Sequence, residues 1–374
     1  MILKNATYLN DKFQFEKGNI SVKDGKFEKI GVEPLNEDEC IDMTGKRIIP
    51  GYVNIHMHGA VGQGVSDTDY EGYNKLSRYL ASTGTTSYLM APATWLKEDL
   101  VKFVGIIKDA IEKGCEGANL LGINMEGPYL SEKYKGAHRA DWLRTPLQVD
   151  FDEVNEAAGG HIMVTTLAPE IDGGIEFVKN YKDKVKISLG HTAADYKCCM
   201  EAFEAGATQI THMFNAMPSI HHRDLSLIAA AFDSGAMVEL ICDGLHVDKT
   251  TVKMAYKMFG DDKIIVINDT EKFAGLPDGE YTTGYSKVIM KDGVVKLENG
   301  TIAGGSAPIH TCVKNLISWG ISAESAVKMA SYNPTVALEI KGKGLIKEGY
   351  DADFNVVDDN FDITDVYIGG KLFK

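Results

Sequence analysis

The sequence predicts an α/β protein: a (β/α)8 TIM barrel joined to a small β-sandwich domain formed by the N- and C-terminal segments. Two observations favour this fold class. Eight short apolar runs alternate with helical patterns between residue 48 and about residue 268. Both ends of the chain instead contain short strands and glycine turns. We therefore expect residues 1–50 and 343–374 to form the β-domain and residues 51–342 to form the barrel.

The N-terminal segment is expected to contain a β-hairpin. Residues 19–23 and 26–30 have the pattern of strands, and Asp24-Gly25 between them is a dipeptide that tight hairpin turns prefer. At the other end, residues 353–357 and 366–368 also have the pattern of strands, and Gly369-Gly370 follows them. Pairing of these two β-rich ends would make one small domain from distant segments.

Barrel strands are expected where β-branched and apolar runs occur between helical patterns. The competing fold, a doubly wound open sheet, is disfavoured because no Gly-x-Gly-x-x-Gly motif follows the first strand. After the eighth strand, residues 288–297 predict a β-hairpin, and helices are expected at about 307–318 and 322–332. The eight expected barrel strands are residues 48–55, 85–90, 119–125, 161–166, 185–189, 208–211, 236–242 and 264–268.

The composition narrows the possible partners. The chain has 374 residues, enough to bury a large core, and a formal net charge of −14. This charge repels nucleic acids and anionic membrane surfaces, so neither is an expected partner. Six cysteines without a C-x-x-C pair indicate reduced thiols. Because there is neither a signal peptide nor an apolar run of membrane-spanning length, we expect a cytoplasmic protein.

Residues that can bind a metal ion follow the predicted strands. His56 and His58 end the first strand, and alternation along a strand points both imidazoles to the same side. Four further residues with nitrogen or carboxylate ligands end other predicted strands: Glu126, His191, His212 and Asp269. Barrel enzymes gather their catalytic groups at the C-terminal ends of the strands. The six residues therefore predict a site for a divalent ion, with zinc favoured and iron or manganese as alternatives.

Six sequence blocks occur in order along nearly the whole chain. They are Pro50-Gly-Tyr-Val-Asn-Ile-His-Met-His, Met125-Glu-Gly-Pro-Tyr-Leu, Leu167-Ala-Pro-Glu, Gly190-His-Thr, Thr211-His-Met-Phe-Asn-Ala-Met and Asp243-Gly-Leu-His-Val-Asp. Together they resemble the N-acetylglucosamine-6-phosphate deacetylases of the amidohydrolase superfamily. The His-x-His block alone marks only the superfamily, whereas the Glu-Gly-Pro, Asn-Ala-Met and Asp-Gly-Leu-His blocks are more specific.

This resemblance implies a ligand set and a substrate site. Glu126, His191 and His212 would bind the principal ion, and His56 and His58 would hold a second ion, with Glu126 bridging and Asp269 nearby. One or two ions would then bind per subunit. A homodimer with a shared phosphate site is also implied. The sugar-phosphate site would contain Ala137, His138, Asn215, Ala216, Arg223, Asp243, Gly244, Leu245, His246, Ile302, Ala303 and Gly304.

The expected activity is hydrolysis of a linear amide: N-acetyl-D-glucosamine 6-phosphate would give D-glucosamine 6-phosphate and acetate. A divalent ion makes hydroxide available at neutral pH for attack on the acetyl carbonyl. Asp269 is expected to act as general base and then general acid, and His138 to donate to the carbonyl oxygen. Arg223 can grip phosphate bidentately. Residues 222–226, however, depart from the Gly-Arg-Glu-Pro-Gly-like run of the family.

Three alternatives stay open. The substrate is the galactosamine epimer if the loops around the sugar select that hydroxyl orientation. A cyclic-amide hydrolase of the same superfamily is less favoured, because such enzymes usually carry a carboxylated lysine at the end of the fourth strand and residues 163–167 contain none. A non-catalytic barrel would be expected to lose ligands, whereas all six are present.

Overall fold

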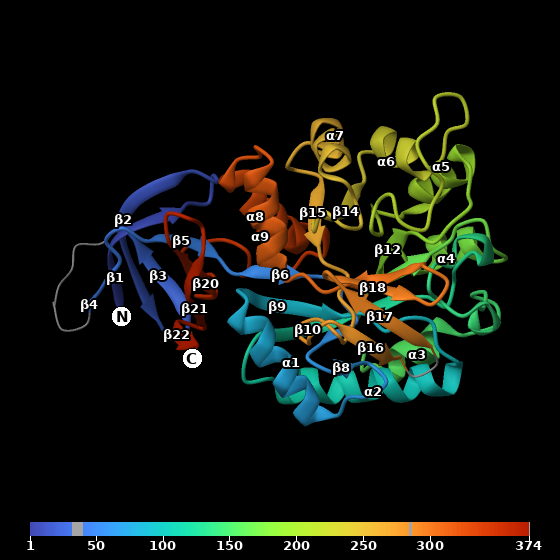
Figure 1. Ribbon diagram of the computed structural model, residues 1–374, viewed down its shortest axis with the longest axis horizontal. Helices are drawn as coiled ribbons and strands as arrows, with labels where there is room; N and C mark the ends of the chain where they lie inside the picture. Colours follow the sequence, from blue (N-terminus) through green and yellow to red (C-terminus); the bar gives the residue numbers. More distant parts are fainter. Residues whose placement is uncertain (32–39, 284–285, 374) are drawn as a thin grey trace.

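The two ends of the chain meet in one sheet. The structure, a computed structural model, describes residues 1–31, 40–283 and 286–373. Figure 1 shows the N- and C-terminal segments side by side, apart from the barrel. Within the described residues the sheet has the order β22-β21-β20-β5-β1-β2-β3, and β4 also pairs with β1. Its strands are β1 (Ile2–Leu9), β2 (Phe15–Lys23), β3 (Lys26–Ile30), β4 (Cys40–Asp42), β5 (Arg47–Pro50), β20 (Phe354–Val357), β21 (Ile363–Ile368) and β22 (Lys371–Phe373).

The predicted hairpin at Asp24-Gly25 is confirmed. It joins β2 to the antiparallel β3, and φ is positive at both Asp24 and Gly25, as a type I′ turn requires. The sheet then curls so that β3 faces β20, where the Phe27 and Phe354 rings lie 5.8 Å apart. The terminal segments thus enclose a core of their own between two facing parts of one continuous sheet.

A second sheet forms the predicted barrel. Neighbouring strands are all parallel, in the order β15-β14-β13-β12-β11-β10-β9-β6. Between the two outermost strands, Asn54 donates to Asn268 at 2.8 Å and the Asp269 N–H donates to the His56 carbonyl at 3.2 Å. The strands are β6 (Tyr52–Asn54), β9 (Thr85–Met90), β10 (Asn119–Glu126), β11 (Ile162–Leu167), β12 (Lys186–Leu189), β13 (Gln209–Ile210), β14 (Met237–Ile241) and β15 (Ile264–Ile267).

The prediction of one strand over residues 48–55 is wrong, because two strands share that run. β5 pairs with β1 and β20 in the terminal sheet, whereas β6 pairs with β9 in the barrel. Gly51 separates them, and its N–H donates to the Asp353 carbonyl. A Cβ at Gly51 would collide with the Thr86 side chain. The chain therefore crosses from one domain to the other at a position where the Thr86 side chain leaves no room for a Cβ atom.

Helices follow the barrel strands in alternation. Aspartates at the helix N-caps explain several starts: Asp69, Asp150, Asp195 and Asp248 each accept a hydrogen bond from a backbone N–H in the first turn. Between the barrel and the terminal domain lie α8 and α9 (Figure 1), and α9 packs on β6 and β15. The helices are α1 (Tyr70–Ser82), α2 (Lys97–Lys113), α3 (Phe151–Ala157), α4 (Gly174–Tyr181), α5 (Tyr196–Ala205), α6 (Leu227–Ser234), α7 (Lys249–Phe259), α8 (Ile309–Ser318) and α9 (Ala323–Ala337), with short 3₁₀ turns η2 (Glu132–Tyr134) and η3 (Ala140–Trp142).

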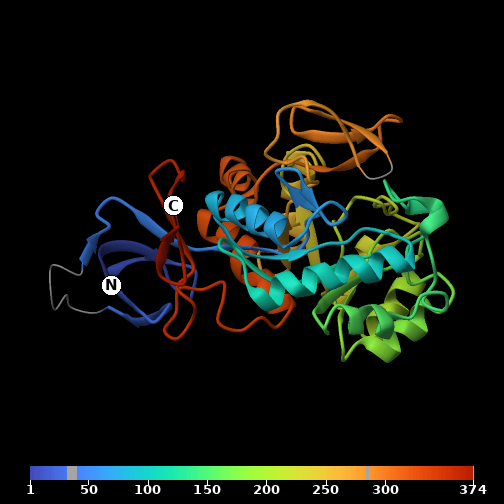
Figure 2. The same cartoon turned by 90° about the horizontal axis from the view of Figure 1, so that it is seen from below.

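A small antiparallel sheet is inserted after β15. It consists of β16 (Gly279–Thr282), β17 (Lys287–Lys291), β18 (Val294–Leu297) and β19 (Ile302–Gly305). The predicted hairpin at 288–297 is the β17–β18 pair. Figure 2 shows this sheet projecting from the barrel. A short ladder of β7 (Gly59–Ala60) and β8 (Gln63–Gly64) follows β6. The insertion places β19 beside the end of β15, where the Thr270–Gly305 bridge joins them.

Among the described residues, no helix has the length and apolar character needed to cross a bilayer. The domain boundaries after residues 50 and 342 stay predictions.

Candidate metal centre

Six side chains converge at the C-terminal end of the barrel. Glu126 is the last residue of β10, and His56 and His58 follow β6. Beyond β12, β13 and β15, the chain turns through left-handed backbone conformations, with φ of 46° at His191, 29° at His212 and 46° at Asp269. Residues other than glycine rarely adopt such backbone angles, and the energetic cost of these angles is tolerated mainly at functional sites. These turns aim His191 and His212 toward Glu126 and aim Asp269 toward His58.

The first cluster consists of Glu126, His191 and His212. Nε2 of His191 lies 3.1 Å from Oε1 of Glu126, and Nε2 of His212 lies 3.0 Å from the same oxygen. The two nitrogens are 3.0 Å apart. All three side chains are buried. Three ligand atoms thus face one small volume.

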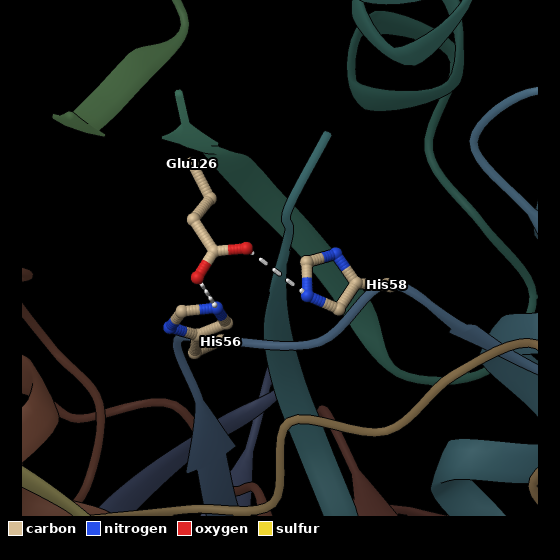
Figure 3. A group of neighbouring side chains, drawn as sticks. All are labelled: His56, His58 and Glu126. Atoms are coloured by element: carbon tan, nitrogen blue, oxygen red, sulfur yellow. Dashed lines mark ion pairs between the residues drawn. The ribbon is translucent and has the colours of Figure 1, made fainter. Parts of the chain in front are cut away.

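The second cluster shares Glu126. Nε2 of His56 lies 3.4 Å from its Oε1, and Nε2 of His58 lies 3.3 Å from its Oε2, so the carboxylate faces both imidazoles (Figure 3). Oδ1 of Asp269 lies 3.0 Å from His58 Nε2 and 3.8 Å from His56 Nε2. Glu126 therefore lies between the two histidine pairs.

The polar atoms of this centre fit cations. His56 Nε2 is buried and makes no hydrogen bond to any described residue, and Asp269 Oδ1 is buried beside Nε2 of His58. Leaving a buried polar atom unpaired costs about 1–3 kcal/mol. Divalent ions between the imidazole nitrogens and the carboxylates would satisfy these atoms, and histidine with carboxylate is a donor set that such ions accept. The centre can therefore hold one ion in each cluster.

Outer contacts orient the imidazoles. The Nδ1 atom of His58 lies 2.7 Å from the Ala91 carbonyl, and that of His191 lies 2.9 Å from the Tyr134 carbonyl. The Nδ1 atom of His56 lies 2.9 Å from Oε2 of Glu239. Each Nδ1 therefore donates outward, and Nε2 is the nitrogen that faces the centre.

Burial and charge decide the protonation of the ligands. Burial lowers the pKa of His191 to about 4, so this imidazole is neutral and ready to ligate at neutral pH. Burial opposes the ionised forms of Glu126 and Asp269, yet the facing histidines outweigh it and hold both pKa values well below their ordinary range. Burial likewise disfavours the charged form of His58, but Asp269 and Glu126 raise its pKa to about 9. An ion at the second cluster must therefore displace a proton.

A cavity of about 290 Å³ opens over the centre. Eight residues that the resemblance assigned to the sugar-phosphate site line it. They are Ala137, His138, Asn215, Ala216, His246, Ile302, Ala303 and Gly304. The insertion after β15 thus supplies part of the wall through β19.

His138 is a hydrogen-bond donor toward the centre. The Thr94 N–H donates to its Nδ1 at 3.2 Å, so the proton of a neutral ring is on Nε2. Nε2 lies 3.3 Å from Oε2 of Glu126. The sequence alone placed His138 only through the resemblance, because a histidine in a glycine-rich loop has no periodic signal.

His246 is held by the turn that precedes it. Oδ1 of Asp243 accepts the Leu245 and His246 N–H groups, and Oδ2 lies 2.7 Å from Nδ1 of His246. Gly244 allows this turn with φ of 80°. Burial lowers the pKa of His246, but Asp243 outweighs that effect and raises it. Its Nε2 is buried without a hydrogen bond to any described residue and faces the cavity. A ligand anion fits this position.

Several predicted site residues lie elsewhere. Arg223 is on the exposed loop 219–225, outside the described residues that line the cavity. Gly244 and Leu245 shape the His246 turn without lining the cavity, and Leu245 is 45% exposed. Their contact with substrate stays a prediction.

Sequence reasoning missed several residues of the site. Glu239 lies in the middle of β14 and contacts His56. The available signal was an acid between the apolar residues Val238 and Leu240. Glu271 lines the cavity two residues after Asp269, and no periodicity marked it. Further lining residues outside the prediction are Ala93, Gly136 and Thr301.

The fold and the site together define a class: a barrel hydrolase with two adjoining histidine–carboxylate clusters suited to divalent ions. The chain belongs to the amidohydrolase family, whose sequence pattern, described as "Amidohydrolase family", matches residues 47–373.

Named relatives are similar over most of the chain. N-acetylglucosamine-6-phosphate deacetylase of Vibrio furnissii is 32% identical over 339 residues, covering 89% of this chain and 84% of that protein. N-acetylgalactosamine-6-phosphate deacetylase of Escherichia coli O157:H7 is 29% identical and covers 99% of this chain and 98% of its own. A solved mutant of N-acetyl-D-glucosamine-6-phosphate deacetylase from Mycobacterium smegmatis, in complex with N-acetyl-D-glucosamine-6-phosphate, has a TM-score of 0.92 at 27% identity, covering 100% of this chain and 99% of that one.

Proposed function

We propose that this protein deacetylates N-acetyl-D-glucosamine 6-phosphate, giving D-glucosamine 6-phosphate and acetate. The observation that carries the proposal is the convergence of Glu126, His191 and His212 below a cavity whose walls match the sugar-phosphate residues of the deacetylase pattern. The similarity to named deacetylases supports the same reaction.

Divalent ions, most simply zinc, are the proposed cofactors. Glu126, His191 and His212 would hold the principal ion, and His56 and His58 would hold the second with Glu126 between them. When bound, such an ion lowers the pKa of water and polarises the acetyl carbonyl.

Two residues of the chain are proposed to carry out proton transfer and hydrogen-bond donation during the reaction. The low pKa of Asp269 keeps its carboxylate ionised, so it can take a proton from the attacking water and return it to the leaving amine. His138, with its proton on Nε2, can donate to the carbonyl oxygen as negative charge develops there.

The sugar phosphate would occupy the outer part of the cavity. His246 is proposed to bind the phosphate, since Asp243 favours its charged form and its Nε2 faces the cavity. Asn215 and Ile302 would contact the sugar. The partner in this reading is a small molecule, and no nucleic acid or membrane is involved.

We also propose that two copies share the phosphate site. Arg223 is exposed on its own subunit, and the same loop together with α6 and α7 carries the exposed apolar side chains Ile220, Leu225, Phe232 and Met254. Pairing through this face would bury them and would bring Arg223 to a neighbouring cavity.

A cytoplasmic location is proposed because no disulfide joins the cysteines of the described residues.

The galactosamine epimer is the second candidate, favoured by the similarity to a galactosamine-specific relative. Acetate release from both epimeric hexosamine 6-phosphates tests the two readings. Zinc-loaded protein should release acetate faster from the glucosamine form, lose activity on chelation and regain it when zinc is returned. Faster turnover of the galactosamine form would favour the alternative. Inertness of the metal-replete protein toward both would overturn the proposal.

A further inference from the structure

We propose that Glu239 is a positioning residue that holds the second ion of the centre through His56. The inference rests on the proposed metal site, and it concerns a residue that contacts neither the cavity nor the substrate. It explains why the middle of an apolar strand carries a carboxylate.

Glu239 is fully buried at the centre of β14. Its Oε2 atom lies 2.9 Å from Nδ1 of His56 and accepts the His212 N–H at 3.2 Å. Its Oε1 atom accepts a hydrogen bond from Nε2 of Gln209 at 3.1 Å. A buried carboxylate is costly unless it is well paired, and this one has a donor on each oxygen.

These contacts fix the tautomer of His56. The His212 and Gln209 groups can only donate, and an ionised carboxylate only accepts, so His56 places its Nδ1 proton toward Glu239. Its Nε2 atom then faces Glu126 and Asp269, where the second ion would lie and would take the place of any proton on that nitrogen. Without this anchor the ring could rotate or exchange tautomers, and the second cluster would lose a ligand.

Glu239 differs from the other anchors in its charge. Backbone carbonyls hold Nδ1 of His58 and His191, whereas a full negative charge holds Nδ1 of His56. A carboxylate behind an imidazole makes the ring a stronger ligand and adds negative charge near a dication. Removing such partners typically lowers metal affinity about 10–100-fold. The expected effect falls on the second ion, because His56 belongs to that cluster.

The substitution Glu239→Gln tests the charge while preserving the packing. The new amide oxygen can accept from His56 and His212 as Oε2 does. Its NH₂ group can donate to Oε1 of Gln209 once that amide turns over, since this oxygen makes no hydrogen bond to any described residue. The variant can therefore keep each hydrogen bond and lose only the charge.

The experiment titrates the stripped full-length protein with zinc and counts bound ions by calorimetry and elemental analysis. Wild type should bind two ions. Glu239→Gln should bind the second about 10–100-fold more weakly and the first with unchanged affinity. In cobalt-loaded protein, the absorption that appears with the second equivalent should weaken selectively. The control Asp353→Asn removes another buried carboxylate, far from the centre and paired with Lys343, and should bind both ions as wild type does.

A double variant tests whether Glu239 acts through His56. In a His56→Gln background, Glu239→Gln should have no additional effect on zinc binding. The inference would be overturned if Glu239→Gln bound both zinc ions as tightly as wild type does. It would also be overturned if the wild-type protein bound only one ion. Neither outcome touches the deacetylase proposal, which depends on acetate release by the wild-type protein.

Discussion

At Asp269, one residue combines a strained backbone with a carboxylate held ionised. The left-handed turn after β15 aims the side chain at His58, and the facing histidines keep its pKa low. A group in this position can both accept a proton from water and contact an ion. Separating these two roles requires a variant that keeps the shape and removes the basicity.

Asp269→Asn is such a variant. We expect turnover to fall by about 10²–10⁴, the loss typical of a missing general base, because an amide cannot take the proton from water. Zinc bound by Glu126, His191 and His212 should stay, which elemental analysis checks alongside acetate release. Activity at the wild-type level would exclude Asp269 from proton transfer.

Some site residues could be predicted because a local sequence pattern marks them. Others could not, because only contacts with residues remote in sequence bring them to the site. His56, His58, Glu126, His191 and Asp269 end strands, and strand ends are visible as breaks in apolar runs. Glu239 contacts residues from two other strands, and such long-range pairing has no local pattern. The tautomer of His138 depends on a backbone N–H at Thr94, which is also remote in sequence.

Among the elements, the junction at Gly51 decides how the two domains join. Residues 48–55 resemble one strand because apolar residues lie on both sides of Pro50-Gly51. This dipeptide was the available sign of a break, whereas the change of pairing partner depends on strands that are remote in sequence. The other barrel strands lie within one residue of their predicted bounds. The glycine at the crossing is explained by the close approach of Thr86.

Gly51→Ala should therefore destabilise the protein by about 1–3 kcal/mol, the usual cost of overpacking a filled site. Denaturant unfolding gives the value. Gly105→Ala, in α2, is the matched control: its new methyl would meet only the Ala157 carbonyl, at 3.9 Å. That variant should instead gain up to about 0.5–1 kcal/mol, because alanine favours helices. Equal effects of the two substitutions would contradict the crowding at Gly51.

For the whole molecule, the exposed apolar side chains of loop 219–225, α6 and α7 are the feature that a single subunit does not explain. Phe232 is 52% exposed and Met254 is 54% exposed. Apolar side chains gathered on one face often mark a contact with another protein. Arg223 lies in the same loop, so the proposed dimer and the proposed phosphate site can be tested together.

Phe232→Glu should convert a dimer into monomers in sedimentation experiments, since a charge cannot be buried in that interface without a partner. The monomer would also lose the contact of the phosphate with Arg223 of the neighbouring copy. If that contact contributes about 1.4 kcal/mol or more to binding, KM for the phosphorylated sugar should rise by about tenfold or more, with a smaller change in kcat. Leu147→Glu, at a leucine that is 78% exposed on a different loop, should leave the dimer intact. A wild-type protein that sediments as a monomer at micromolar concentration would refute the shared site.

The position of β5 between β1 and β20 has a consequence for biosynthesis. The ribosome makes β5 early, but its second neighbour emerges about 300 residues later, a delay of about 15–60 s at ordinary elongation rates. During that interval one edge of the nascent sheet lacks its partner and can recruit strands from other polypeptides. Slower translation lengthens this exposure, so recombinant yield should depend on chaperones that shield the growing chain.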